Sequence, residues 1–176
     1  GRFGEYFNAA MEVKRANNLL QDNSKKFPNF HLNLKGLGLI NAVLGNLPDG
    51  ALKTALSTFG IKGNLQSGLN MFEKLADNLP KSSYEPFYEE VVFYYAYVLT
   101  DVAHSPQAYA KTMRYTERIA DTSLLKSYLQ SYVCIKNGHS EEAISILARR
   151  PEGGVYQPFP YLDYLEGIAH LNKLDL

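Results

Sequence analysis

Apolar and polar residues follow each other along most of this chain with the period of an α-helix. Apolar side chains recur three or four positions apart, as at Phe7, Ala10 and Met11 near the start. No stretch shows the alternation at every second residue that is typical of a half-buried β-strand. The pattern therefore predicts an all-α protein, built as an antiparallel stack of about nine helices with short connections.

Turn and capping residues divide the chain into these helices. Asn137-Gly138 is a typical C-terminal stop, and the run from Pro151 to Gly154 is the clearest loop. Glycine is favoured just beyond a helix, whereas proline and serine are favoured at its start. The expected helices cover residues 1–22, 29–46, 51–59, 64–78, 84–103, 106–120, 123–136, 140–149 and 160–173.

The helix expected from Tyr84 to Ala103 is the most apolar. From Val91 to Leu99 it carries no charged residue. A helix that is apolar on nearly every side must be covered on nearly every side, so we expect it at the centre of the stack. A helix that crosses a bilayer needs about 20 apolar residues, and this run is too short to be one.

Three glycines interrupt the expected second helix, at Gly36, Gly38 and Gly45. Each glycine costs about 1 kcal/mol relative to alanine inside a helix. We interpret them as sites where another backbone approaches closely. A segment that touches a membrane surface is the alternative interpretation.

Small residues also recur twelve positions apart, once in each helix of an expected hairpin. The pairs are Ala96 with Ala108, Ser131 with Ala143 and, less well, Leu56 with Gly68. The frame repeats after 40, 35 and 36 residues, the last step ending at Gly167. A small residue in each helix allows two antiparallel helices to approach each other, while larger apolar residues fill the space beside them.

This frame resembles the tetratricopeptide repeat, a helix–turn–helix unit of about 34 residues. In the best unit, Asn137 to Leu147, Gly138, Ala143 and Leu147 stand at consensus places. The segment Tyr161–Ala169 resembles the first helix of a further unit, and a second unit is matched by Phe59, Gly63, Gly68, Phe72 and Pro80. The resemblance implies one domain over residues 1–176, with degenerate repeats at 48–176 after a helical pair at 1–47 that lies outside the consensus.

Composition and motifs give no support for catalysis. The 18 basic and 18 acidic residues balance, with a pI near 7.1, which removes the electrostatic case for nucleic acid as a partner. No phosphate-binding loop, nucleophile elbow, metalloprotease motif or dinucleotide fingerprint is present. The four histidines have no ligand spacing, so we expect a protein that is not an enzyme and has no metal or cofactor.

Individual polar residues have structural explanations. Cys134 occupies a position where the repeat requires a buried apolar residue, and His170 also falls on a packing position. The pairs Glu89-Glu90 and Glu141-Glu142 lie near helix N-termini, where they complement the helix dipole.

The tyrosines provide the one functional prediction. The chain has 13 tyrosines and no tryptophan. Since arrays of this family bind ligands on the concave face formed by the first helix of each hairpin, the resemblance implies a tyrosine-lined groove for a protein or peptide partner. The candidate binding residues are Phe93, Tyr97, Tyr128, Tyr132, Lys136, Tyr161, Tyr164 and Ile168.

Several alternatives stay open. The rings could pack helix against helix without binding a partner. The chain could also be a fragment, a structural or regulatory module of a longer polypeptide whose groove is filled by its own segments. A pocket around Tyr88 and Tyr95 would instead indicate a helical enzyme or a small-molecule carrier. Compartment, cytoplasmic or extracytoplasmic, and oligomeric state are not indicated by the sequence.

Overall fold

The protein is all-helical. The computed structural model describes residues 2–174, with side chains from Gly4 onward. Within these residues there are nine α-helices and no strand, which confirms the predicted all-α class. No helix among them is both long enough and apolar enough to traverse a bilayer.

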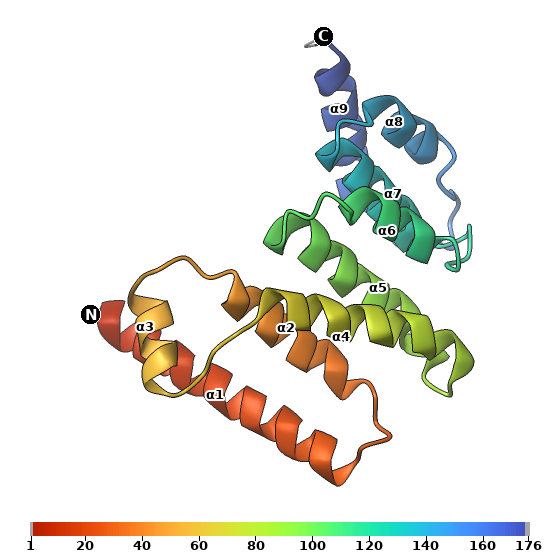
Figure 1. Ribbon diagram of the computed structural model, residues 1–176. Coiled ribbons are helices and arrows are strands. Elements are labelled where there is room, and N and C mark those ends of the chain that lie inside the picture. The colour runs from red at the N-terminus through yellow and green to blue at the C-terminus, as the bar shows by residue number, and fades with distance from the viewer. Residues whose placement is uncertain (1, 175–176) are drawn as a thin grey trace. The chain divides into compact units, whose positions relative to one another are not determined.

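Two compact units make up the chain, Gly1–Ala103 and His104–Leu176, and each is described by itself (Figure 1). The first unit holds α1 (Arg2–Lys26), α2 (Asn33–Gly45), α3 (Ala51–Thr58), α4 (Leu65–Asn78) and α5 (Tyr88–Tyr97). The second holds α6 (Ala108–Thr116), α7 (Leu124–Lys136), α8 (Ser140–Ala148) and α9 (Pro160–Leu174).

The helices were predicted in the right order, but some of their ends differ. Helix α1 continues to Lys26, beyond the expected stop at residue 22. Helix α2 begins only at Asn33, because the segment around Pro28 forms turns. A 3-10 turn at Glu85–Phe87 precedes α5, so this helix is shorter than expected at its N-terminus.

Helices α2 and α4 approach each other through glycines, as the sequence predicted for α2. A Cβ added to Gly38 would lie 3.3 Å from the carbonyl oxygen of Gly68 on α4, and Gly45 lies against the backbone of Leu65. Gly36 instead faces α1, where an added Cβ would lie 2.8 Å from Leu20 Cδ1. These positions are tight because backbones or neighbouring side chains take up the space that a larger residue would need.

Helix α3 packs against α1 rather than pairing with α4. The rings of Phe7 on α1 and Phe59 after α3 lie 4.8 Å apart, and Leu56 belongs to a buried cluster with Ala10 and Ile61. Gly68 contacts α2. The frame of small residues, which paired Leu56 with Gly68, therefore does not correspond to a packed hairpin of α3 and α4.

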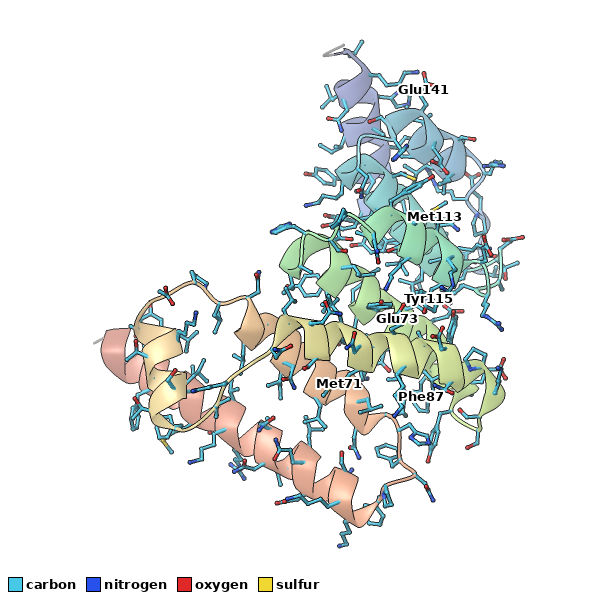
Figure 2. All side chains as sticks on the ribbon, viewed as in Figure 1. Met71, Glu73, Phe87, Met113, Tyr115 and Glu141 are labelled. Atoms are coloured by element: carbon cyan, nitrogen blue, oxygen red, sulfur yellow. The ribbon has the colours of Figure 1, made fainter. Side chains whose placement is uncertain are left out.

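Helix α5 is largely buried, as predicted for the most apolar stretch. Tyr95 is 1% exposed and stacks on Phe72 of α4, with 5.9 Å between ring centroids. Tyr88 is 6% exposed, so both tyrosines belong to the core. Phe87, just before the helix, is 44% exposed (Figure 2). A π-helical turn, Val98–Val102, continues the helix.

The described part of the second unit is a series of four helices joined by turns and loops. Gly138 has φ +80° and ends α7, with the His139 N–H donating to the Cys134 carbonyl at 2.8 Å. This is the stop that Asn137-Gly138 predicted. Ala143 and Cys134 are 0% exposed and pack in one cluster with Ala169 of α9. His170 is exposed, so the prediction that it occupies a packing position is wrong.

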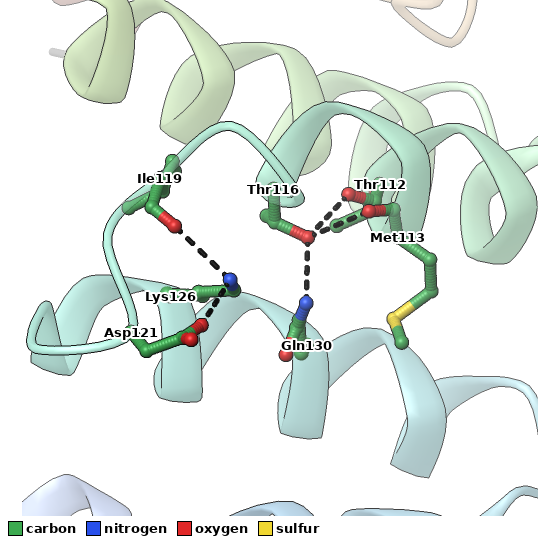
Figure 3. Close-up of polar contacts among 7 residues, drawn as sticks. All are labelled: Thr112, Met113, Thr116, Ile119, Asp121, Lys126 and Gln130. Atoms are coloured by element: carbon green, nitrogen blue, oxygen red, sulfur yellow. Dashed lines mark hydrogen bonds and ion pairs between the residues drawn. The ribbon is translucent and has the colours of Figure 1, made fainter. Parts of the chain in front are cut away.

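Polar contacts join α6 to α7 (Figure 3). The Gln130 amide donates to Thr116 Oγ1 at 3.0 Å, and that hydroxyl lies 2.8 Å from the Thr112 carbonyl. Lys126 Nζ donates to the Ile119 carbonyl at 3.0 Å and to Asp121 Oδ1 at 2.6 Å. These bonds orient α7, the helix that carries two of the candidate tyrosines.

Candidate functional site

Five aromatic rings from the second unit form one continuous cluster, which we call the tyrosine surface. Two come from α7, two from α9 and one from the loop just before α9. They are Tyr128, Tyr132, Phe159, Tyr161 and Tyr164.

Tyr128 lies at the centre of this surface. Its ring centroid is 5.7 Å from that of Tyr132, 5.6 Å from that of Phe159 and 5.7 Å from that of Tyr161. Tyr164 extends the cluster, 5.2 Å from Tyr161. These separations fall within the range of about 4.5–7 Å in which aromatic pairs attract each other. The rings therefore support one another as a semi-rigid face.

Helix geometry explains why the sequence brings these rings together. Tyr128 and Tyr132 are four residues apart in α7, and Tyr161 and Tyr164 are three apart in α9, so each pair lies on one helix face. Helix α9 packs against both α7 and α8, which places the two faces side by side.

Burial divides the surface into a base and an exposed part. Tyr128 and Tyr132 are half-buried and pack against the buried cluster of Leu147, Leu162 and Leu165. By contrast, Tyr161 is 44% exposed and Tyr164 is 57% exposed. The α7 tyrosines thus serve the core as well, while the α9 tyrosines present most of the accessible ring area.

Charged groups border the aromatic rings. Lys136 Nζ lies 5.3 Å from the ring centroid of Tyr132, a cation–π contact at the end of α7. Arg150 donates to Glu166 Oε2 at 2.7 Å and to Asp163 Oδ1 at 2.8 Å, which ties the loop before α9 to that helix. Arg150 thus has a tertiary role that its place at the end of α8 did not indicate.

The remaining predicted residues are not part of this cluster. Phe93 and Tyr97 lie on α5 in the first unit, where Tyr97 is 44% exposed and Phe93 is half-buried beside Tyr94. Ile168 is half-buried on α9. Of the eight candidates, the structure brings together Tyr128, Tyr132, Tyr161, Tyr164 and the adjacent Lys136.

Phe159 was missed by sequence reasoning because it lies in a loop, where periodicity gives no signal. Its position directly before Pro160, the first residue of α9, was the available cue. Proline is favoured in the first turn of a helix, and an apolar residue just before that turn often folds back onto the helix or its neighbours.

Tyr109 of α6 forms polar and aromatic contacts with residues at the start of α8. Tyr109 Oη donates to Glu142 Oε2 at 2.7 Å, and its ring stacks on His139 with 4.3 Å between centroids. The bond to Glu142 and burial together raise the pKa of Tyr109 to about 12. Burial, with the nearby Glu142 carboxylate, raises the pKa of the Cys134 thiol to about 12.

This arrangement opposes nucleophilic chemistry at Cys134. The thiolate is the reactive form of cysteine, and a thiol with so high a pKa stays protonated at neutral pH. The predicted buried position of Cys134 is confirmed, since the residue is 0% exposed. Among the described residues no group of three or more histidine, cysteine or acidic side chains is placed to hold a metal ion.

Comparison with known proteins does not assign this chain to a family. No known protein family, no curated protein and no solved structure matches this chain.

Proposed function

We propose that this protein is a non-enzymatic scaffold whose tyrosine surface binds a peptide segment of a protein partner. The observation that carries the proposal is the exposure of Tyr161 and Tyr164 on a face supported from below by Tyr128. Tyrosine offers a large contact area with few rotatable bonds and a hydroxyl at its rim, which suits it to protein recognition. The resemblance to tetratricopeptide arrays supports the same role.

The test is a selection of displayed random peptides on the wild-type protein, followed by affinity measurement with the enriched peptides. We expect the Tyr161→Ala/Tyr164→Ala variant to bind these peptides more than about tenfold more weakly, because buried aromatic anchors in interfaces contribute about 2 kcal/mol or more. Both rings are exposed, so the variant should keep the melting temperature of the wild type.

A matched control removes two aromatic rings of similar exposure outside the tyrosine surface. Tyr6 is 39% exposed and Phe87 is 44% exposed, both in the first unit. The Tyr6→Ala/Phe87→Ala variant should bind the peptides as the wild type does. If no peptide is enriched, or if both variants bind equally, the proposal is rejected.

One observation favours a second candidate, a module whose tyrosine surface is covered by its own polypeptide. Phe159 already contacts Tyr128 from the loop before α9, and α9 also exposes Leu171 and Leu174 at 58% and 81%. In that case the Phe159 ring takes the place of a side chain of the bound peptide on Tyr128, and Phe159→Ala should increase affinity for the selected peptides. Unchanged or reduced affinity would reject the self-covered surface.

A further inference from the structure

A basic cavity of about 310 Å³ lies in the first unit, whereas the tyrosine surface belongs to the second unit. Its walls come from the turn before α2 and the first turn of α2, from α4 and from the 3-10 turn Leu79–Lys81 that follows α4. Three basic side chains line it, His31, Lys74 and Lys81. The volume is at the lower end of the range of about 300–1,000 Å³ that is typical of small-molecule sites.

The positive charge of this cavity is not balanced by its own walls. None of its lining residues is acidic. Within the described part of the chain, neither Lys74 nor Lys81 forms an ion pair, in contrast with Lys53, which pairs with Asp49 at 2.9 Å. Lys74, Asn78 and Lys81 follow one another four and three residues apart, which places all three on one face of α4 and its continuation.

The other walls are apolar or held in place by hydrogen bonds. Leu75 is 1% exposed and Leu34 is half-buried, so the cavity has an apolar floor. The Asn78 amide donates to the Lys74 carbonyl at 2.6 Å. Ser82 Oγ donates to the Leu79 carbonyl at 2.9 Å and accepts from the Tyr84 N–H at 3.1 Å. These hydrogen bonds hold the backbone of the turn that carries Lys81 and Ser82.

From these features we infer that the cavity binds a small phosphate monoester with an apolar body. Lysine ammonium groups are compact point charges with three donors each, and they bind phosphate well. A phosphate dianion would balance two lysines, whereas a carboxylate would balance one. The apolar part of the ligand would lie on Leu34 and Leu75. This inference does not depend on the proposed role of the tyrosine surface.

The experiment uses phenyl phosphate as the probe, with inorganic phosphate and benzoate as comparison ligands, in isothermal titration calorimetry of the whole chain. We expect phenyl phosphate to bind more tightly than both, since inorganic phosphate lacks the apolar body and benzoate has a single charge. Binding should shift the NMR signals of the His31 ring and of the Ser82 amide.

Variants separate a specific site from general charge attraction. Lys74→Ala/Lys81→Ala should weaken phenyl phosphate binding about tenfold, since the variant removes both charges that balance the phosphate dianion. The control Lys53→Ala/Lys62→Ala removes the same charge from exposed positions of the same unit and should leave the affinity unchanged.

Each other result overturns the inference. If phenyl phosphate does not bind, the proposed site does not exist. If the two double-lysine variants weaken phenyl phosphate binding equally, the binding is non-specific charge attraction. If inorganic phosphate binds as tightly as phenyl phosphate, the apolar floor does not contribute to binding. Equal or tighter binding of benzoate would show a carboxylate site instead.

Discussion

Gly68 of α4 lies against Ala42 of α2 so closely that a Cβ added to Gly68 would be 2.6 Å from the Ala42 backbone nitrogen. The same added atom would be 2.6 Å from the carbonyl oxygen of Gly38. Both neighbours are backbone atoms, which cannot turn away as a flexible side chain can. The packing of α2 on α4 therefore requires glycine at this position.

Substitution Gly68→Ala should destabilise the protein. The extra methyl group forces the two helices apart, and overpacking of this kind costs about 1–3 kcal/mol. Urea unfolding of the variant should show this loss as a lower midpoint. Gly167 on α9 is the matched control, because an added Cβ there has no atom within 4 Å. Gly167→Ala should instead stabilise the protein by about 0.5–1 kcal/mol through helix propensity.

Ala143→Leu should overpack the second unit. Ala143 is 0% exposed among Cys134 and Ala169, so three added carbon atoms have no space, and we expect a loss of about 1–3 kcal/mol in the free energy of unfolding. Ala148, on the same helix, is exposed, and Ala148→Leu should stay within about 0.5 kcal/mol of the wild type. Thermal unfolding of both variants checks this, and a neutral Ala143→Leu would contradict the packing.

Glycine positions show what the sequence could predict. A glycine inside a helix has a propensity cost, so its presence at Gly38 and Gly45 pointed to close packing, and the structure confirms it. The sequence did not predict in the same way which helix packs against these glycines. The frame of small residues paired Gly68 of α4 with Leu56 of α3, whereas α4 packs on α2. Sequence spacing defines a helix face but not which helix covers it.

The tyrosine surface was predictable in the same limited sense. Spacings of three and four residues put Tyr161 with Tyr164 and Tyr128 with Tyr132 on common faces, and these faces meet. Phe159 lies in a loop and shows no periodicity, so only the folded chain places it on Tyr128. For a similar reason the ion pairs of Arg150 were not expected, because they depend on how a loop returns to α9.

Stability should fall as the pH rises toward 12. The pKa values of Cys134 and Tyr109 are each raised to about 12 in the folded protein, from ordinary values of about 9 and about 10. Between the ordinary and the raised values the unfolded chain has lost protons that the folded chain still holds, so unfolding becomes easier as pH increases. Below these ordinary values the contribution is fully present.

The measurement is a comparison of variants, which isolates the contributions of Cys134 and Tyr109. Urea unfolding between pH 8 and pH 11 should show a shallower loss of stability with pH for Cys134→Ala and for Tyr109→Phe than for the wild type. The control is Ser145→Ala, at an exposed position on α8 in the same unit, which removes no titrating group and should keep the wild-type slope. Equal slopes in all four proteins would contradict the prediction.

Arg150 should stabilise the second unit through its two carboxylate partners. Its side chain is 20% exposed and pairs with Glu166 and Asp163, so we expect Arg150→Ala to lower the free energy of unfolding by about 1–2 kcal/mol, and less at high salt. A double-mutant cycle with Glu166→Gln isolates the pair. The corresponding cycle at Lys53 and Asp49, whose side chains are 47% and 97% exposed, is the control and should give a coupling energy close to zero. Equal coupling energies in the two cycles would show that the Arg150 pair contributes no more than an ordinary surface ion pair.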